Sequence, residues 1–132
     1  MNKVYGAYLC TGCGIGDVLD VDGLKSAASE LGMEMQEHAC LCGSDGRACI
    51  EKDINEKGVN TIVVCACSPR VMQKEFDFGQ GTITVRGNLR EQVAWTAGDP
   101  PEGGGVDEYL QEMGGDYVRM AVTRANKTAL PE

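Results

Sequence analysis

The feature that most constrains the fold of this chain is a regular alternation of strand-like and helix-like segments. Apolar runs rich in β-branched residues predict strands over residues 3–10, 33–39, 60–66 and 82–86. Capping residues and apolar spacing predict helices over residues 21–31, 45–57, 69–76, 90–96 and 106–126. Strand–helix–strand units form right-handed crossovers, which make the strands parallel. We therefore predict a three-layer α/β fold with a mostly parallel four-stranded sheet, helices on both faces and a C-terminal helix.

The expected strand order places the first strand beside both the second and the third, as in flavodoxin-like and Rossmann-like sheets. The segment DPPEGGG predicts a loop over residues 99–105, between an α/β cysteine-cluster domain at 1–98 and a C-terminal helix at 106–127 that packs on it. The paired Gly114 and Gly115 predict a break in this helix. Residues 128–132 are typical of the beginning of a linker.

Six of the seven cysteines lie in three short clusters, and each cluster follows a predicted strand. The clusters are CTGC, CLC and CAC, which contain Cys10 and Cys13, Cys40 and Cys42, and Cys65 and Cys67. Ligands of parallel sheets bind outside the carboxyl ends of the strands, and these ends meet at one edge. We therefore expect all three clusters at this edge. Cys49 follows the apolar spacing of a predicted helix and is expected to be a buried structural thiol.

Charge and composition narrow the class of protein. The 132-residue chain has a net charge of −8 and lacks the basic stripe with which proteins neutralise phosphates, which argues against nucleic acid as a partner. No apolar run approaches the roughly 20 residues that span a bilayer, so no direct membrane insertion is expected. An odd number of cysteines in close pairs, without an export signal, indicates the reducing cytoplasm, where such clusters bind metals or take part in redox chemistry.

Thiolates bind soft and borderline metals, and four of them hold either tetrahedral zinc or an iron–sulfur cluster. The spacing matches neither paired zinc knuckles nor a ferredoxin run, so the expected convergence in space is what favours iron–sulfur. Gly12, Gly14 and Gly43 are candidates for presenting backbone N–H groups to cluster sulfurs, or they serve tight turns. Two alternatives stay open: a thiol–disulfide redox site formed by Cys10 and Cys13, and a structural docking domain without metal.

Five segments together resemble a known family. In chain order they are YLCTGCGIG, CLCGSDG, VVCACSPRV, GNLREQVAW and YVRMAVTRA, and they resemble the N-terminal domain of the A subunit of heterodisulfide reductase. The likeness is closer still to a related flavoprotein, the B subunit of the quinone-interacting membrane-bound oxidoreductase. The resemblance implies a cytoplasmic electron-transfer module with a [4Fe–4S] cluster, whose partners are a flavin domain and other redox subunits. FAD would be bound only by the full-length protein, and the isolated domain would have no complete activity.

The resemblance also implies a set of metal ligands. Positions that match the family motifs are Cys13, Cys42 and Cys67, while Val93 stands where many members carry another cysteine. Cys10 is the first substitute for that missing ligand, and Cys40 and Cys65 form a second tier. In the same family context, Arg70 and Trp95 are expected to face the partner domain.

Overall fold

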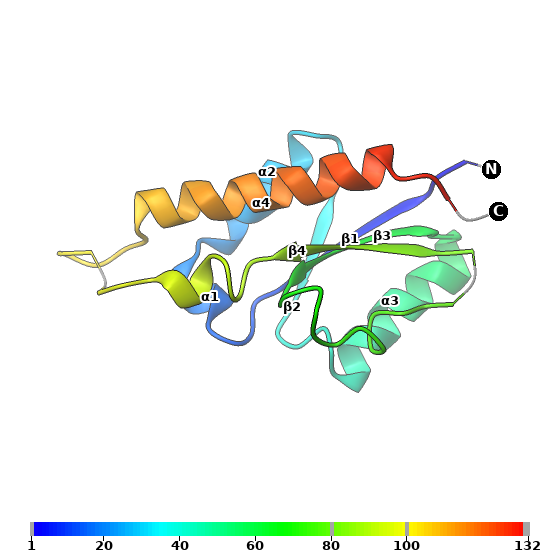
Figure 1. The fold of residues 1–132 in the computed structure, drawn as a ribbon, viewed down its shortest axis with the longest axis horizontal. Coiled ribbons are helices and arrows are strands. Elements are labelled where there is room, and N and C mark those ends of the chain that lie inside the picture. Colours follow the sequence, from blue (N-terminus) through cyan, green and yellow to red (C-terminus); the bar gives the residue numbers. More distant parts are fainter. Residues whose placement is uncertain (1, 80, 100, 131–132) are drawn as a thin grey trace.

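The computed structural model describes residues 2–79, 81–99 and 101–130, and a sheet of four parallel strands lies at its centre (Figure 1). The strands are β1 Tyr5–Cys10, β2 Met35–His38, β3 Thr61–Ala66 and β4 Ile83–Asn88, in the spatial order β2-β1-β3-β4. In the register of β1, Cys10 lies opposite His38 on β2 and Leu9 lies opposite Cys65 on β3. The predicted α/β class and the central position of the first strand are confirmed.

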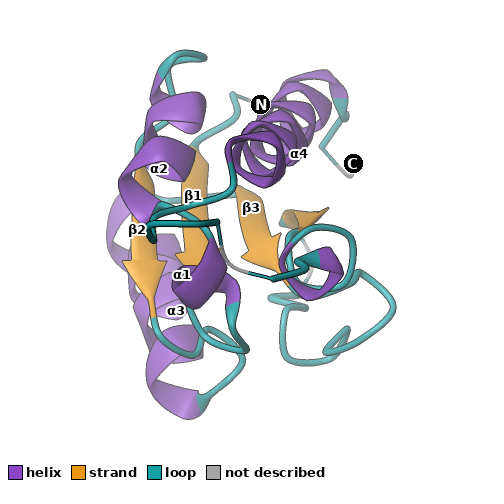
Figure 2. Ribbon diagram, turned by 90° about the vertical axis from the view of Figure 1, so that its left-hand side faces the viewer, coloured by secondary structure: helices purple, strands orange, loops and turns teal. Residues whose placement is uncertain are grey.

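Helices cover both faces of the sheet. α2 (Val21–Ser29) and α4 (Glu108–Lys127) lie on one face, and α3 (Ser44–Lys57) lies on the other (Figure 1 and Figure 2). Every residue of β3 is buried, as the continuous apolar run predicts. Because successive side chains point to opposite faces, β3 supplies Val63 and Cys65 to the core under α2 and α4, and Ile62, Val64 and Ala66 to the core under α3.

The helix predicted over residues 69–76 is wrong, because this segment forms a series of turns. Two of its carbonyl groups accept hydrogen bonds from side chains of β4. Arg86 donates to the carbonyl of Val71 at 3.1 Å, and the hydroxyl of Thr84 donates to the carbonyl of Phe76 at 2.9 Å. Met72 adopts a left-handed φ of 57°, which interrupts a helix. The turns therefore follow the polar side chains of the neighbouring strand.

Two short elements also differ from the expectation. α1 (Ile15–Val18) forms directly after the CTGC cluster, where no helix is predicted. The helix predicted over 90–96 contracts to a 3₁₀ turn, η1 (Ala94–Thr96), because Val93 has φ −123° and ψ −70°, outside the helical region.

The helix α4 runs unbroken through Gly114 and Gly115, so the predicted break is wrong. A Cβ atom at Gly114 would lie 3.1 Å from the Cδ2 atom of Leu24 on α2. The glycine therefore serves the close approach of two helices. At its N-terminus the carboxylate of Asp107 accepts hydrogen bonds from the N–H groups of Tyr109 and Leu110, which caps the helix.

The described part of the segment 99–105 consists of turns and bends, and Gly103, Gly104 and Gly105 have φ between 85° and 87°. Residue 100 and the last two residues of the predicted linker, 131 and 132, lie outside the described residues. Among the residues that the structure does describe, no helix combines the length and the apolar character needed to cross a membrane. The division of the chain into a domain, a loop and a packed helix stays a prediction.

Candidate functional site

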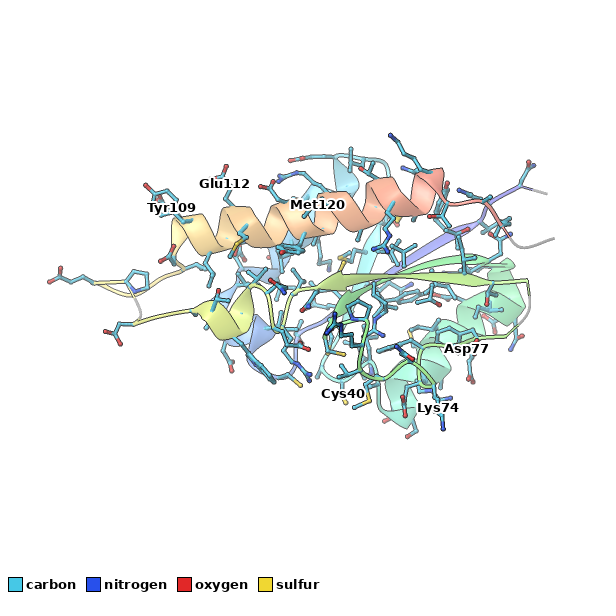
Figure 3. All side chains as sticks on the ribbon, viewed as in Figure 1. Cys40, Lys74, Asp77, Tyr109, Glu112 and Met120 are labelled. Atoms are coloured by element: carbon cyan, nitrogen blue, oxygen red, sulfur yellow. The ribbon has the colours of Figure 1, made fainter. Side chains whose placement is uncertain are left out.

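Cysteine side chains gather at the carboxyl edge of the sheet, on the face covered by α3. Cys10 is the last residue of β1, and Cys67 follows β3; each is 7% exposed and belongs to the core under α3. Cys42, in the loop after β2, packs against the same core. Cys40 is exposed and lies on the α3 side of the sheet in Figure 3. Three strand ends therefore bring sulfur atoms to one face of one edge.

The electrostatics of Cys42 show that these thiols influence one another. Its sulfur lies 3.6 Å from that of Cys40. The pKa of Cys42 is raised to about 11, first by burial, then by the hydrogen bond to Cys40, and further by repulsion from the thiolates of Cys40, Cys10 and Cys67. Repulsion of this kind opposes the thiolate form in the free protein. A bound cation would reverse it, because it is attracted to every thiolate at once.

Cys13, the second cysteine of CTGC, is placed differently. It is exposed, has a left-handed φ of 54°, and its sulfur accepts a hydrogen bond from Nη1 of Arg90 at 3.7 Å. Trp95 donates from Nε1 to the carbonyl of Cys13 at 2.9 Å, and the guanidinium of Arg90 lies 4.4 Å above the Trp95 ring. With 59% of its surface exposed, Trp95 is not a core residue.

Cys65 does not join the other thiols, because it lies on the opposite face of the sheet. It is completely buried in the core under α2 and α4, where burial raises its pKa to about 12. Val93 is also completely buried in that core. Cys49 on α3 is half-buried, and its thiol lies 3.8 Å from the amide oxygen of Gln36.

Two arginines that contact thiols were missed by the sequence reasoning. Arg86 on β4 donates from Nη2 to the sulfur of Cys67 at 3.0 Å, and Arg90 donates to Cys13. Burial raises the pKa of Cys67, while the positive charges of Arg86 and Arg90 lower it in part. The signal in the sequence was an arginine at the end of the apolar run TITVR, where alternation places it on the same face as Thr84.

The carboxylate of Glu91 ties the two arginine-bearing segments together. It forms an ion pair with Arg90 at 2.8 Å and accepts hydrogen bonds from the backbone N–H of Ser68 at 3.1 Å. Burial raises the pKa of Glu91, but the hydrogen bonds from Arg90 and Ser68 outweigh it, so the pKa is lowered overall. The loop that carries Cys67 is thereby fastened to the segment after β4.

The three glycines named from the sequence lie in the loops of the site. A Cβ atom at Gly12 would collide with the carbonyl of Ala39, so only glycine allows the loops after β1 and β2 to cross so closely. Gly14 has φ 85°. The N–H of Gly43 donates to the carbonyl of Cys40 at 3.2 Å, and a Cβ atom there would lie 3.3 Å from the Cys40 sulfur. Tight turns account for the glycines at positions 12 and 43.

The donor chemistry of the site suits an iron–sulfur cluster, since four thiols from three loops are soft ligands on one face. Among the residues that the structure describes, no three His, Cys, Asp or Glu side chains are already arranged to hold a metal ion. The thiols therefore fit such a group by type and by location, and not by a ready-made coordination geometry.

The CTGC pair offers little support for dithiol chemistry. All seven cysteines are free thiols. The Cys10 sulfur lies 3.9 Å from the carbonyl of Ala39, while the Cys13 sulfur contacts Arg90. The two thiols of the pair thus have separate surroundings.

Comparison with known proteins gives three informative relatives. Over 129 residues, the chain is 36% identical to the A subunit of the H(2):CoB-CoM heterodisulfide,ferredoxin reductase of Methanothermobacter thermautotrophicus, covering 91% of this chain and 19% of that protein. It is 32% identical to the A subunit of the ferredoxin/F(420)H(2)-dependent CoB-CoM heterodisulfide reductase of Methanosarcina acetivorans, covering 91% of this chain and 16% of that protein.

The third relative is an iron-sulfur A subunit, numbered 2, of the CoB–CoM heterodisulfide reductase of Methanopyrus kandleri, 30% identical with 91% of this chain and 19% of that protein covered. No protein-family model matches the chain. The chain spans less than a fifth of the length of these relatives. Its homologues are therefore the A subunits of heterodisulfide reductases, which are components of oxidoreductases.

Proposed function

We propose, from the gathered thiols and the homology to the A subunits of heterodisulfide reductases, that this chain is an iron–sulfur electron-transfer module of a heterodisulfide-reductase-like oxidoreductase. The observation that carries the proposal is the convergence of Cys10, Cys40, Cys42 and Cys67 on the α3 side of one sheet edge. The name of the Methanopyrus relative, which describes it as an iron-sulfur protein, supports the same assignment.

The roles of the residues follow from their positions. Cys10, Cys42 and Cys67 would hold the cluster from the ends of three different segments, and a fourth sulfur would come from Cys13 or Cys40. When bound, a [4Fe–4S] cluster supplies a one-electron carrier. The buried side chains around Cys10 and Cys67 keep water from much of the site, and a drier site strengthens the electrostatic influence of neighbouring charges.

The wider assignment is part of the same proposal. In the full-length protein we place this module beside a flavin domain that binds FAD and among other redox subunits, in the cytoplasm, with the B-subunit flavoprotein of the quinone-interacting oxidoreductase as the nearest kind of relative. An electron would enter from one reduced partner and leave to an oxidised one, so the module gains and loses one electron in each cycle. Trp95 and Arg70, both exposed, are available to such a partner.

The test is anaerobic reconstitution of the chain with iron and sulfide, followed by iron analysis and visible spectroscopy. We expect about four irons per chain and a broad visible absorption that a reductant bleaches. A colourless, iron-free protein after reconstitution would overturn the proposal, and a colourless protein that retains zinc would favour the docking domain.

Single variants then identify the fourth ligand. Cys13→Ser and Cys40→Ser are compared with Cys49→Ser, which changes a thiol on α3 that lies beside Gln36. We expect only one of the first two to lose iron, and the Cys49→Ser control to retain it. Loss of iron in the control variant would contradict the location of the site.

A further inference from the structure

We propose that Arg86 is a positioning residue that makes the cluster easier to reduce, by holding a positive charge and an N–H group against the Cys67 sulfur. This inference rests on the proposed iron–sulfur function and adds the residue that sets the potential of the centre. Arg86 lies on β4, in a segment that follows the last cysteine by almost twenty residues, so it has no place in the cysteine motifs.

The guanidinium of Arg86 is held in one position by several contacts. Nη2 donates to the Cys67 sulfur at 3.0 Å, to the Cys67 carbonyl at 3.3 Å and to the Ser68 carbonyl at 3.1 Å. Nη1 donates to the carbonyl of Val71 at 3.1 Å, and the ring of Phe76 lies 4.4 Å from the guanidinium carbon. A side chain fixed by this many partners presents its charge to the sulfur without first losing rotamer freedom.

The charge of Arg86 is not neutralised by a carboxylate. Among the described residues, no Asp or Glu forms an ion pair with it, and the nearby Glu91 pairs with Arg90 instead. The Nε atom of Arg86 is buried and has no hydrogen-bond partner within the described part of the chain. A half-buried cation with an unpaired donor costs folding free energy, so packing alone is a poor reason for an arginine here. The Cys67 sulfur is the ionisable group to which it donates.

The consequence for a cluster follows from charge. Reduction adds one negative charge, and a hydrogen bond or cation at a ligand sulfur stabilises the reduced form. Arg90 also reaches a thiol, but its charge is shared with Glu91 at 2.8 Å and its contact with Cys13 is longer, at 3.7 Å. Arg86 should therefore have the larger effect on the potential.

The experiment is a redox titration of the reconstituted chain under anaerobic conditions, with iron content measured on the same samples. Arg86→Met removes the charge and the donor, Arg86→Gln keeps N–H donors without the charge, and Arg86→Lys keeps the charge. The matched control is Arg124→Met, since Arg124 lines the same cavity of about 610 Å³ as Arg86 but does not contact Cys67.

We expect Arg86→Met to reduce the equilibrium constant for cluster reduction about tenfold, which corresponds to a potential lower by about 59 mV for one electron. Arg86→Lys should restore most of the shift and Arg124→Met should leave the potential unchanged. If Arg86→Met does not hold iron, a lower potential for Arg86→Gln than for Arg86→Lys supports the proposal.

Equal potentials in the wild type and in every Arg86 variant that holds iron overturn the inference but leave the proposed function intact. An equal shift in Arg124→Met also overturns it, because the effect would then belong to net charge. A wild-type chain that takes up no iron overturns both proposals.

Discussion

The two faces of the sheet meet the same carboxyl edge but treat the cysteines there in opposite ways. On the α3 side, Cys10, Cys42 and Cys67 come together with Cys40, next to an arginine. On the α2 and α4 side, Cys65 is sealed in an apolar core with Val93. Cys65 and Cys67 are two residues apart, yet the strand ends between them. The comparison teaches that the point at which β3 ends, and not the spacing of CAC, decides which thiol reaches the site.

The largest difference between the two faces should appear in iron retention. Cys67→Ser removes a sulfur from the α3 side and should abolish stable iron binding, because a hydroxyl is a poor ligand for iron–sulfur clusters. Cys65→Ala should retain iron close to the wild-type level. Iron per folded chain, with circular dichroism as the check on folding, is the measurement. Equal retention in the two variants would break the comparison between the faces.

The core under α2 and α4 should affect stability without affecting the site. Leu24 is completely buried, so Leu24→Ala should lower the free energy of unfolding by about 2–5 kcal/mol. The iron content of the folded fraction should not change. Urea denaturation gives the stability, and Leu31→Ala, at a residue that is 44% exposed, is the control with little expected change. A large loss of iron in Leu24→Ala at low urea would show that the two faces are coupled.

A buried hydrogen bond under α3 should make stability depend on pH. Tyr8 donates to the carboxylate of Asp53 at 2.6 Å. Burial raises the pKa of Asp53, but hydrogen bonds from Tyr8 and Gln36 and the charge of Lys57 outweigh it and lower the pKa. A lowered pKa stabilises the fold above the unfolded value of about 3.9, and this contribution is lost as the pH falls through the folded value.

Tyr8→Phe should therefore cost about 1.5–3 kcal/mol at neutral pH, the usual range for a hydrogen bond to a charged group. The difference from the wild type should shrink below about pH 4, where Asp53 becomes protonated in the unfolded state. Chemical denaturation at several pH values measures this, with Tyr5→Phe on the exposed start of β1 as the control. A difference that is constant with pH would exclude Asp53 as the cause.

The smallest expected effect concerns the crossing of the loops after β1 and β2. Gly12→Ala places a methyl group against the carbonyl of Ala39 and should cost about 1–3 kcal/mol by overpacking. Because these loops carry Cys10 and Cys40, iron should also be released faster to a chelator. Gly98→Ala, where a Cβ atom would have no neighbour within 4 Å, is the matched control. Unchanged stability and release in Gly12→Ala would mean that the loops can separate freely.

Much of the fold followed from local patterns. The apolar run TIVVCA predicted a strand buried on both faces, and all six of its residues are buried. The helix predicted over 69–76 failed because partners far away in the sequence, Arg86 and Thr84, capture its carbonyl groups. The break predicted at Gly114 failed because a glycine that weakens an isolated helix also lets it approach Leu24.

The candidate site divides in the same way. By itself, the sequence determined that three cysteine clusters end three strands, because apolar runs and cysteine spacing are local properties of the chain. Only the tertiary structure decided that Cys65 turns into the apolar core, that Cys13 meets Arg90, and that Arg86 reaches Cys67. The physical reason is that strand ends, sheet register and loop crossings set which sulfur meets which charge, and these depend on contacts between distant segments.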